Sequence, residues 1–284
     1  MERAIWDLCQ LGHARFLEEV AAGIEHVVGL FDELDVAADK LLQTDDFYRP
    51  QHLENYPAKV LRNLAKEEAT KVLILLDVVR CPASMKKERS RTLGYFYDHI
   101  AKGIYADVCG WQLGQFEELE RCIEKLRAQY HRDPEGIFPN DIRYFREYDT
   151  YVNYVRDDNR SEVKHRWTVP NRQVAVFDST PLVVDVARAL HEAGVTSQAG
   201  LAVVAEVWRP VELRPEMGTD ERQQMNRRTL DALRERGLLA TARSQVYERI
   251  EYEWPFPLWP LDLEERKVNL NSLRPAQHYP QGRW

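Results

Sequence analysis

Five side chains that can hold or move a proton occur at helical spacing in the first half of the sequence. Glu67, Glu68 and Lys71 lie within about one turn of each other on a helix, where residues three and four apart share a face. His99 and Lys102 are three residues apart in a second stretch. Carboxylates, amines and an imidazole are general acids and bases, so these five are candidate catalytic residues for acid–base chemistry on a phosphodiester.

The same residue types also fit a role without chemistry. Glu-Glu-x-x-Lys on a helix often forms solvated ion pairs that contribute a few tenths of a kcal/mol, about 0.3–0.5 each. A helical histidine near aromatic residues is often a partly buried packing residue. The spacing alone therefore leaves both interpretations open.

A carboxylate also interrupts the apolar run that begins at Val72. This residue is Asp77, and burial of its charge is costly unless a base pairs with it. Arg80 is three residues away, on the same helix face. We expect Asp77 to form a structural polar pair with Arg80 or with a base from another helix.

Long helices must position these residues. Apolar residues recur at three- and four-residue steps over 2–42, which predicts one helix there. A second helix is expected from about Leu53 to Cys81, where Pro82 ends it, with Pro57 tolerated in its first turn. A third is expected from residue 84 or 85 to about 111. An antiparallel hairpin of the second and third helices would bring Glu67 near His99.

The rest of the chain is predicted to be mixed in structure. Helices are expected over 113–130, over 141–155 with a packing stripe of tyrosines, from 180 to Gly194, over 201–208 and from Thr219 to Gly237. Short strands are expected over 174–177 and 246–254, followed by prolines and a polar tail. The fold class is therefore mainly α, with a helical bundle domain over 1–156, a linker over 157–173 and a smaller, mostly helical accessory region over 174–284 that contains a few short strands.

Composition excludes several classes of protein. The 284 residues are 44% hydrophobic and 30% charged, so a full core is expected. The net charge of −7 excludes a uniformly basic nucleic-acid binder. Neither an apolar span nor a signal core is present, which predicts a cytoplasmic protein without a membrane partner. The four scattered cysteines (Cys9, Cys81, Cys109 and Cys122) indicate reduced thiols, and we expect neither a metal site nor a cofactor.

The charge is unevenly distributed along the chain. Residues 1–51 carry a net charge of −7, whereas residues 52–112 carry ten Lys or Arg and seven Asp or Glu, a net +3. A basic cluster starts the third predicted helix, and an aromatic residue that can stack on a base follows it. The candidate RNA-binding residues are Lys86, Lys87, Arg89, Arg91 and Tyr95. A solvated helix start is the alternative interpretation.

Two segments together resemble a known family. Residues 65–71 read Ala-Lys-Glu-Glu-Ala-Thr-Lys and are followed by Asp77-x-x-Arg80-Cys81-Pro82 and by Asp98-His99-Ile100-Ala101-Lys102. These segments resemble the AbiV abortive-infection family, assigned to the HEPN superfamily, and the resemblance covers about residues 2–130. It implies an HEPN-like helical bundle, a tendency to form homodimers and a role in bacterial antiphage defence.

Many HEPN proteins are metal-independent ribonucleases whose motif is an Arg followed closely by a His. In this chain Arg91 is one residue too far from His99 to complete that motif. The one full match, Arg160 to His165, falls in a predicted loop, and chance matches are expected. The resemblance therefore implies either a variant RNA-directed toxin or a defence protein without catalytic activity that binds a protein partner, such as a phage protein or an antitoxin.

Overall fold

The structure is a computed structural model. It describes residues 2–43, 51–109, 111, 114–128, 140, 142–143, 146, 153–156, 165–168 and 180–266, with the backbone alone for 51–55 and for the two strands. The described residues are mainly helical, as predicted. The helices are α1 (Glu2–Gln10), α2 (His13–Gln43), α3 (Gln51–Arg80), α4 (Lys86–Gly94), α5 (His99–Val108), α6 (Phe116–Leu126), α8 (Leu182–Glu192), α9 (Gln198–Trp208), α10 (Thr219–Glu235) and α11 (Ser244–Glu253).

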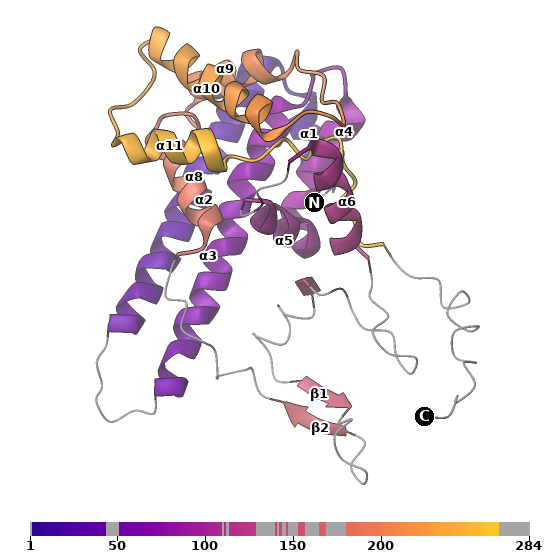
Figure 1. Ribbon diagram of the computed structural model, residues 1–284, viewed down its shortest axis with the longest axis vertical. Coiled ribbons are helices and arrows are strands. Elements are labelled where there is room, and N and C mark those ends of the chain that lie inside the picture. The colour runs from indigo at the N-terminus through magenta and orange to yellow at the C-terminus, as the bar shows by residue number, and fades with distance from the viewer. Residues whose placement is uncertain are drawn as a thin grey trace, which may run out of the picture.

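Two long helices, α2 and α3, lie side by side and form the centre of the fold (Figure 1). The buried face of α2 includes Phe16, Val20, Ile24 and Phe31, at the spacing that its sequence pattern predicted. The last part of α3, from Val72 to Arg80, is buried on all sides, since α4, α5, α8 and α9 also pack against this helix. The central position of α3 explains why its run from Val72 onward is apolar around the whole helix.

The first predicted helix is divided in two. It stops after Gln10 and begins again at His13, and the carbonyl oxygen of Gly12 accepts the hydrogen bond from the amide of Phe16. Glycine in a helix interior is unfavourable because it loses the most backbone entropy on folding. The break at Gly12 also lets α1 turn and pack against α4.

The third predicted helix is divided as well. A single 3-10 turn, η1 (Tyr95–Tyr97), separates α4 from α5. The backbone of Asp98 is extended, and its carboxylate accepts a hydrogen bond from the amide of Ala101 at 2.8 Å. Aspartate is a favoured N-cap because its side chain satisfies a free amide of the first turn. Asp98 therefore begins α5 and does not continue the preceding helix.

The prediction of a strand over 246–254 was wrong, because residues Ser244–Glu253 form α11. The alternation of Ile250, Tyr252 and Trp254 with two glutamates misled the prediction, since the helix buries one residue deeply, Ile250. Side chains of α10 complete its C-terminal end, where Asn226 donates to the carbonyl oxygens of Ile250 and Trp254 at 3.1 and 2.9 Å. Such capping from another helix is a tertiary interaction that a short sequence window cannot reveal.

Two short strands occur where other structure was expected. The strands β1 (Asn153–Arg156) and β2 (His165–Thr168) pair antiparallel, with Asn153 opposite Thr168. They replace the end of the helix predicted to Val155 and part of the predicted loop. Their residues include Tyr154, Val155 and Trp167, types that favour strands. The tyrosines of the predicted stripe before Asn153 and the strand predicted over 174–177 lie outside the described residues.

The C-terminal region packs into the same core as the first helices. The ends of α8 and α10 agree with the predicted stop signals, since Gly194 and Gly237 follow these helices with φ of 82° and 66°. The segment from Trp254 to Leu263 lies largely buried, and one hydrophobic cluster extends from Phe16 to Leu263. The core is thus continuous across the predicted boundary between the bundle and the accessory region.

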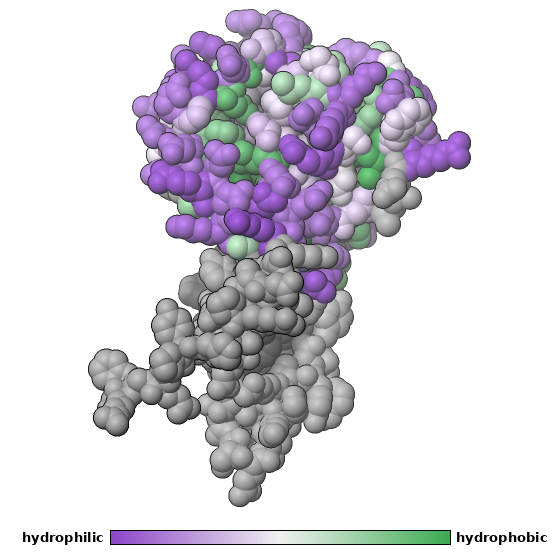
Figure 2. All heavy atoms as spheres, turned by 90° about the vertical axis from the view of Figure 1, so that its right-hand side faces the viewer, coloured by the Kyte–Doolittle hydropathy of each residue, from purple (hydrophilic) through white to green (hydrophobic). Residues whose placement is uncertain are grey.

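The surface is polar over much of its area. The described residues on the face shown in Figure 2 are mostly hydrophilic, with smaller apolar areas between them. Within the described part of the chain, no helix combines the length and the apolar character needed to cross a bilayer.

Gly200→Ala is expected to destabilise the protein by about 1–3 kcal/mol. A Cβ atom at Gly200 would lie 2.2 Å from the carbonyl oxygen of Gly194 and 2.7 Å from that of Val195, and both are backbone atoms. Urea unfolding measures the effect. Gly29→Ala is the matched control, because a Cβ there meets nothing within 4 Å, and we expect it to stabilise α2 by about 0.5–1 kcal/mol. Equal effects of the two substitutions would contradict this packing.

Candidate functional site

Three of the five candidate catalytic residues meet at one carboxylate. One oxygen of Glu67, on α3, lies 2.9 Å from Nδ1 of His99 and accepts a hydrogen bond from Nζ of Lys102 at 3.0 Å. His99 and Lys102 both belong to the first turn of α5, which Asp98 begins. The helical hairpin expected from the sequence therefore does bring these groups together.

A fourth residue, Arg146, completes the cluster. Its Nε donates to the second oxygen of Glu67 at 2.6 Å. Gly103 lets the segment that carries Arg146 approach α5 closely, since a Cβ there would lie 2.2 Å from Cγ2 of Ile142. The amide of Ile142 in turn donates to the side chain of Asn140 at 2.9 Å. No local signal in the sequence links Arg146 to Glu67, because 79 positions separate them.

The exposure of the cluster differs from residue to residue. The side chain of His99 is 49% exposed, whereas that of Lys102 is 6% exposed and that of Glu67 is 19% exposed. Burial raises the pKa of Glu67, but the hydrogen bond from Arg146 and the charge of Lys102 outweigh it, so the pKa lies below its ordinary value. Glu67 is therefore a carboxylate at neutral pH that holds the imidazole at the surface.

An open pocket of about 380 Å³ lies beside this cluster. Glu67, His99, Lys102 and Arg146 line it, together with an ion pair in which Nζ of Lys66 lies 3.2 Å from Asp107. Three cations and two carboxylates thus face the pocket, and the half-exposed imidazole adds a neutral or positive group. The excess of positive charge suits an anionic ligand.

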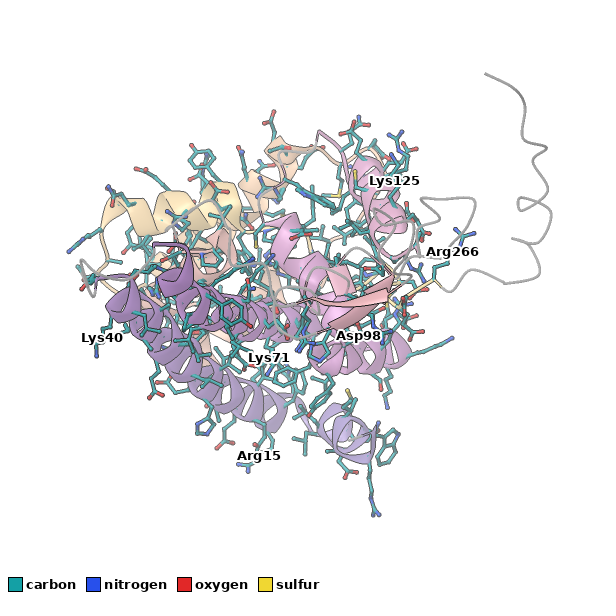
Figure 3. All side chains as sticks on the ribbon, turned by 90° about the horizontal axis from the view of Figure 1, so that it is seen from below. Arg15, Lys40, Lys71, Asp98, Lys125 and Arg266 are labelled. Atoms are coloured by element: carbon teal, nitrogen blue, oxygen red, sulfur yellow. The ribbon has the colours of Figure 1, made fainter. Side chains whose placement is uncertain are left out.

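The other two candidate catalytic residues form a separate pair. Nζ of Lys71 donates to both oxygens of Glu68, at 2.6 and 2.7 Å, and lies 4.8 Å from the ring centre of Phe96. Neither residue lines the pocket. Figure 3 labels Lys71 on α3 and Asp98 at the start of α5. The structure thus divides the five candidates into three residues at the pocket and one local ion pair.

The predicted RNA-binding cluster is largely used in packing. Lys86 and Lys87 are exposed, but Arg89 is 7% exposed and lies 4.3 Å from the ring centre of Phe16. Arg91 donates to backbone oxygens near the C-terminal end of the core, at 2.9 and 3.2 Å. The local charge pattern did not reveal these contacts, because their partners are far away in the sequence.

Tyr95 cannot stack on a base as expected, because it is 2% exposed. Its hydroxyl donates to the carbonyl oxygen of Leu261 at 3.3 Å and accepts from the amide of Leu263 at 3.0 Å. These bonds fix the C-terminal segment against α4 and η1. Tyr95 is thus a structural residue in this fold.

Asp77 and Arg80 lie together in the core. Nη1 of Arg80 lies 3.2 Å from Asp77, whose other oxygen accepts from the hydroxyl of Tyr105 at 2.7 Å and from the amide of Leu258 at 2.6 Å. Burial raises the pKa of Asp77 to about 6, against the opposing charge of Arg80. Burial likewise lowers the pKa of Arg80 to about 10. The pair connects α3 to α5 and to the C-terminal segment.

The chain was compared with protein-family models, curated proteins and solved structures. No match was found in any of the three comparisons. The resemblance to the AbiV family stays a prediction from the sequence.

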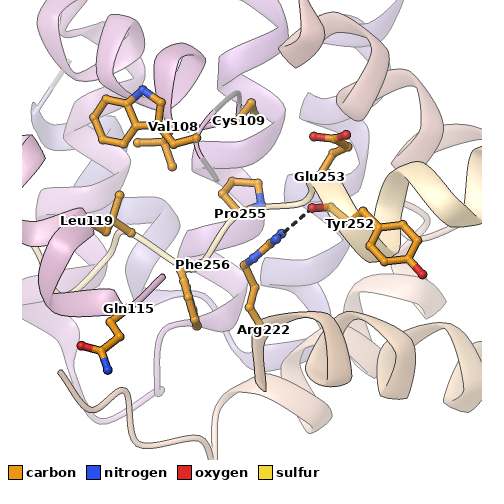
Figure 4. Close-up of a pocket in the computed structure, with 10 residues that line it drawn as sticks. Val108, Cys109, Gln115, Leu119, Arg222, Tyr252, Glu253, Pro255 and Phe256 are labelled. Carbon is orange, nitrogen blue, oxygen red and sulfur yellow. Dashed lines mark hydrogen bonds between the residues drawn. The ribbon is translucent and has the colours of Figure 1, made fainter. Parts of the chain in front are cut away.

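A second, smaller cavity lies between α5, α6 and the end of α11 (Figure 4). Its volume is about 20 Å³, which is room for a single water molecule. The side chain of Arg222 lines this cavity and donates to the carbonyl oxygen of Tyr252 at 2.8 Å. Burial raises the pKa of the adjacent thiol of Cys109, so it is an inert thiol. This cavity has neither the size nor the groups for a reaction.

The histidine and the carboxylates at the pocket do not form a metal site. Among the described residues, no group of three such side chains is close enough to hold a metal ion. The alternative ribonuclease match, Arg160 to His165, is not placed: Arg160 lies outside the described residues, and His165 begins β2.

Glu67→Gln is expected to destabilise the protein by about 1–3 kcal/mol at pH 7, because Lys102 loses a charged partner. Since the pKa of Glu67 is lower in the folded protein than its ordinary value of 4.5, the carboxylate stabilises the fold above that value. The contribution disappears as the pH falls through the folded pKa. The free energy of unfolding of both proteins, measured from pH 7 to pH 3, should converge in acid.

Glu120→Gln provides the control for this experiment. Glu120 is exposed on α6, and we expect its removal to change stability little at any pH. A difference between Glu67→Gln and the parent protein that stays constant with pH would contradict the ion-pair role of Glu67.

Proposed function

We propose that the protein is an RNA-directed effector of bacterial antiphage defence that cleaves RNA at the Glu67 pocket without a metal ion. The observation that carries the proposal is the 2.9 Å contact between Nδ1 of His99 and the carboxylate of Glu67. A carboxylate bound to Nδ1 favours the tautomer in which Nε2 is free to accept a proton. Because His99 is half exposed, that nitrogen is accessible to a substrate.

The chemistry follows from these groups. His99 takes the proton from a ribose 2′-hydroxyl, the 2′-oxygen attacks the adjacent phosphorus, and the bond from phosphorus to the 5′-oxygen breaks. Water protonates the leaving 5′-oxygen, and the imidazolium returns its proton to the solvent. Lys102 and Arg146 supply positive charge where the phosphorane gains negative charge. The products are a 2′,3′-cyclic phosphate and a 5′-hydroxyl end.

The proposal includes two expectations inherited from the family resemblance, namely that the helices form an HEPN-like bundle and that the protein is a homodimer. A third expectation, that it acts in the cytoplasm, comes from the sequence composition. A second subunit that brings its own pocket alongside the first would extend the surface available to RNA. Light scattering of the purified protein tests the homodimer directly.

The proposed activity is tested by incubating the purified protein with total RNA and with tRNA in the presence of a chelator. We expect cleavage that leaves 2′,3′-cyclic phosphate ends, which are detected because a phosphatase cannot remove them until acid opens the ring. Glu68→Gln serves as the control, since among the described residues Glu68 pairs with Lys71 alone, and we expect this variant to cleave at the parental rate. RNA that stays intact would overturn the proposal.

A second proposal is that the protein acts by binding a protein partner. It is favoured by the use of Arg89, Arg91 and Tyr95 in packing, which removes most of the expected RNA contacts. In that case protection against phage survives substitution of His99. Phage plaque formation is measured on bacteria that express the parent protein or His99→Ala, and this comparison separates the two proposals.

A further inference from the structure

Three basic side chains lie near the C-terminal end of α3, away from the Glu67 pocket. They are His13, the first residue of α2, Arg89 of α4, and Arg209, which follows α9. Nη1 of Arg209 lies 3.3 Å from Nδ1 of His13, and its Nε donates to the carbonyl oxygen of Val79 at 2.9 Å. The guanidinium of Arg89 lies over the ring of Phe16, one turn into α2.

The two guanidinium groups have no acidic partner among the described residues. Arg89 is only 7% exposed, and its side chain makes no hydrogen bond or ion pair there. Nε of Arg89 and Nη2 of Arg209 are buried polar atoms without a hydrogen-bond partner. Arg62 shows the contrast, because Asp35 and Asp39 both pair with it. A buried cation without a partner is costly, so its presence calls for a physical reason.

The start of α2 adds further positive character at the same place. The first amides of a helix have no carbonyl partner within it, and no side chain caps those of His13 and Ala14 in the described structure. A Cβ atom at Gly12 would meet nothing within 4 Å, so no other part of the described structure packs against this glycine. The 31 residues of α2 also direct the positive end of their dipole toward this point.

The electrostatic surroundings are consistent with this geometry. Burial lowers the pKa of His13, and the positive charges of Arg209 and Arg89 lower it further. Burial and Arg89 also lower the pKa of Arg209. Arg15 on α2 differs from Arg89 and Arg209, because the carboxylates of Glu18 and Glu19 pair with it. Positive charge therefore accumulates at Arg89 and Arg209 without a counter-charge among the described residues, and His13 beside them offers an uncharged imidazole.

We propose that His13, Arg89, Arg209 and the amides at the start of α2 form a binding site for a phosphate group. Two guanidinium groups donate to phosphate oxygens, and a helix start favours an anion. The site is distinct from the Glu67 pocket, since Val79 lies twelve residues after Glu67, a distance of about 18 Å along α3. It does not depend on whether the Glu67 pocket is catalytic. The phosphate belongs either to a free nucleotide or to the end of an RNA chain.

Inorganic phosphate is the first probe. The melting temperature of the full-length protein is measured with increasing phosphate, while chloride keeps the ionic strength constant. We expect the melting temperature to rise with phosphate, because a ligand that binds only the folded state stabilises it. In Arg209→Met and Arg89→Met the affinity for phosphate should fall by about 10-fold or more, since each variant loses a charged hydrogen-bond donor.

Arg89→Met gives a second, independent measurement without phosphate. Because Arg89 is a buried cation without an acidic partner, its replacement by methionine should keep or raise the melting temperature of the free protein. Arg15→Met is the matched control. Arg15 lies in the first turn of α2, at the end opposite Lys40 (Figure 3), and already pairs with Glu18, so its substitution should not change the affinity for phosphate. No response to phosphate in the parent protein, or an equal response in Arg209→Met, would overturn the proposal.

Two further probes distinguish the sources of the phosphate. A nucleoside monophosphate is compared with its nucleoside, and a short RNA with a 5′-phosphate is compared with the same RNA ending in a hydroxyl. Binding of the monophosphate at least as tight as that of the RNA supports a free nucleotide. Tighter binding of the phosphorylated RNA alone supports an RNA end.

Discussion

His99→Ala is expected to lower the rate of RNA cleavage by about 10²- to 10⁴-fold, the usual contribution of a general base. The reason is that Nδ1 of this imidazole is held by Glu67 at 2.9 Å, while the ring is half exposed beside the pocket. Because the side chain is not part of the core, its removal should leave the melting temperature nearly unchanged. Cleavage rates and thermal unfolding of the same preparation separate the two effects.

His26→Ala is the matched control for this experiment. His26 is an exposed histidine on α2 and does not line the pocket, so cleavage should continue at the parental rate. Added imidazole should restore part of the activity of His99→Ala, because a free base can enter the space that the side chain leaves. An unchanged rate in His99→Ala would show that the pocket is not the site of cleavage.

Asp77→Ala is expected to destabilise the protein by about 3–5 kcal/mol, since it leaves a buried charge without its partner. Arg80 is 1% exposed and lies between two tryptophan rings, 3.8 Å from that of Trp254 and 4.6 Å from that of Trp208. The substitution also removes the acceptor for the hydroxyl of Tyr105 and the amide of Leu258. Urea unfolding measures the loss.

Two further variants separate the buried charge from the lost hydrogen bonds. Asp77→Asn keeps an acceptor oxygen and should cost less than Asp77→Ala. The double substitution Asp77→Ala with Arg80→Met removes both charges, and we expect it to be more stable than Asp77→Ala alone. Additive losses in the double variant would contradict a coupled pair.

The pH dependence of this pair has a definite sign. The pKa of Asp77 is raised in the folded protein to about 6, above its ordinary value of 3.8, because burial disfavours the charge. Between these two values the folded state binds more protons than the unfolded state, so stability falls as the pH rises through this range. Glu67 acts in the opposite direction, since its pKa is lowered.

Much of the helical structure was determined by the sequence alone. The periodicity of apolar residues predicted α2 and α3, and the glycine signals placed the ends of α8 and α10. Contacts between residues three apart, such as Glu68 with Lys71 and Asp77 with Arg80, also follow from helix geometry. These features are local, so a short window of residues contains the information that fixes them.

Only the tertiary structure decided which polar residues form the pocket. Arg146 reaches Glu67 across 79 positions, and the sequence carries no periodic signal for such a contact. Burial of Arg89 and Tyr95 depends on Phe16 and on the C-terminal segment, which pack against them from distant positions. Helix α11 was taken for a strand because apolar and charged residues alternate near its end, while the side chain that caps that end comes from α10. Local propensity predicts the elements, whereas the surface that each side chain faces is set by the packing of distant elements.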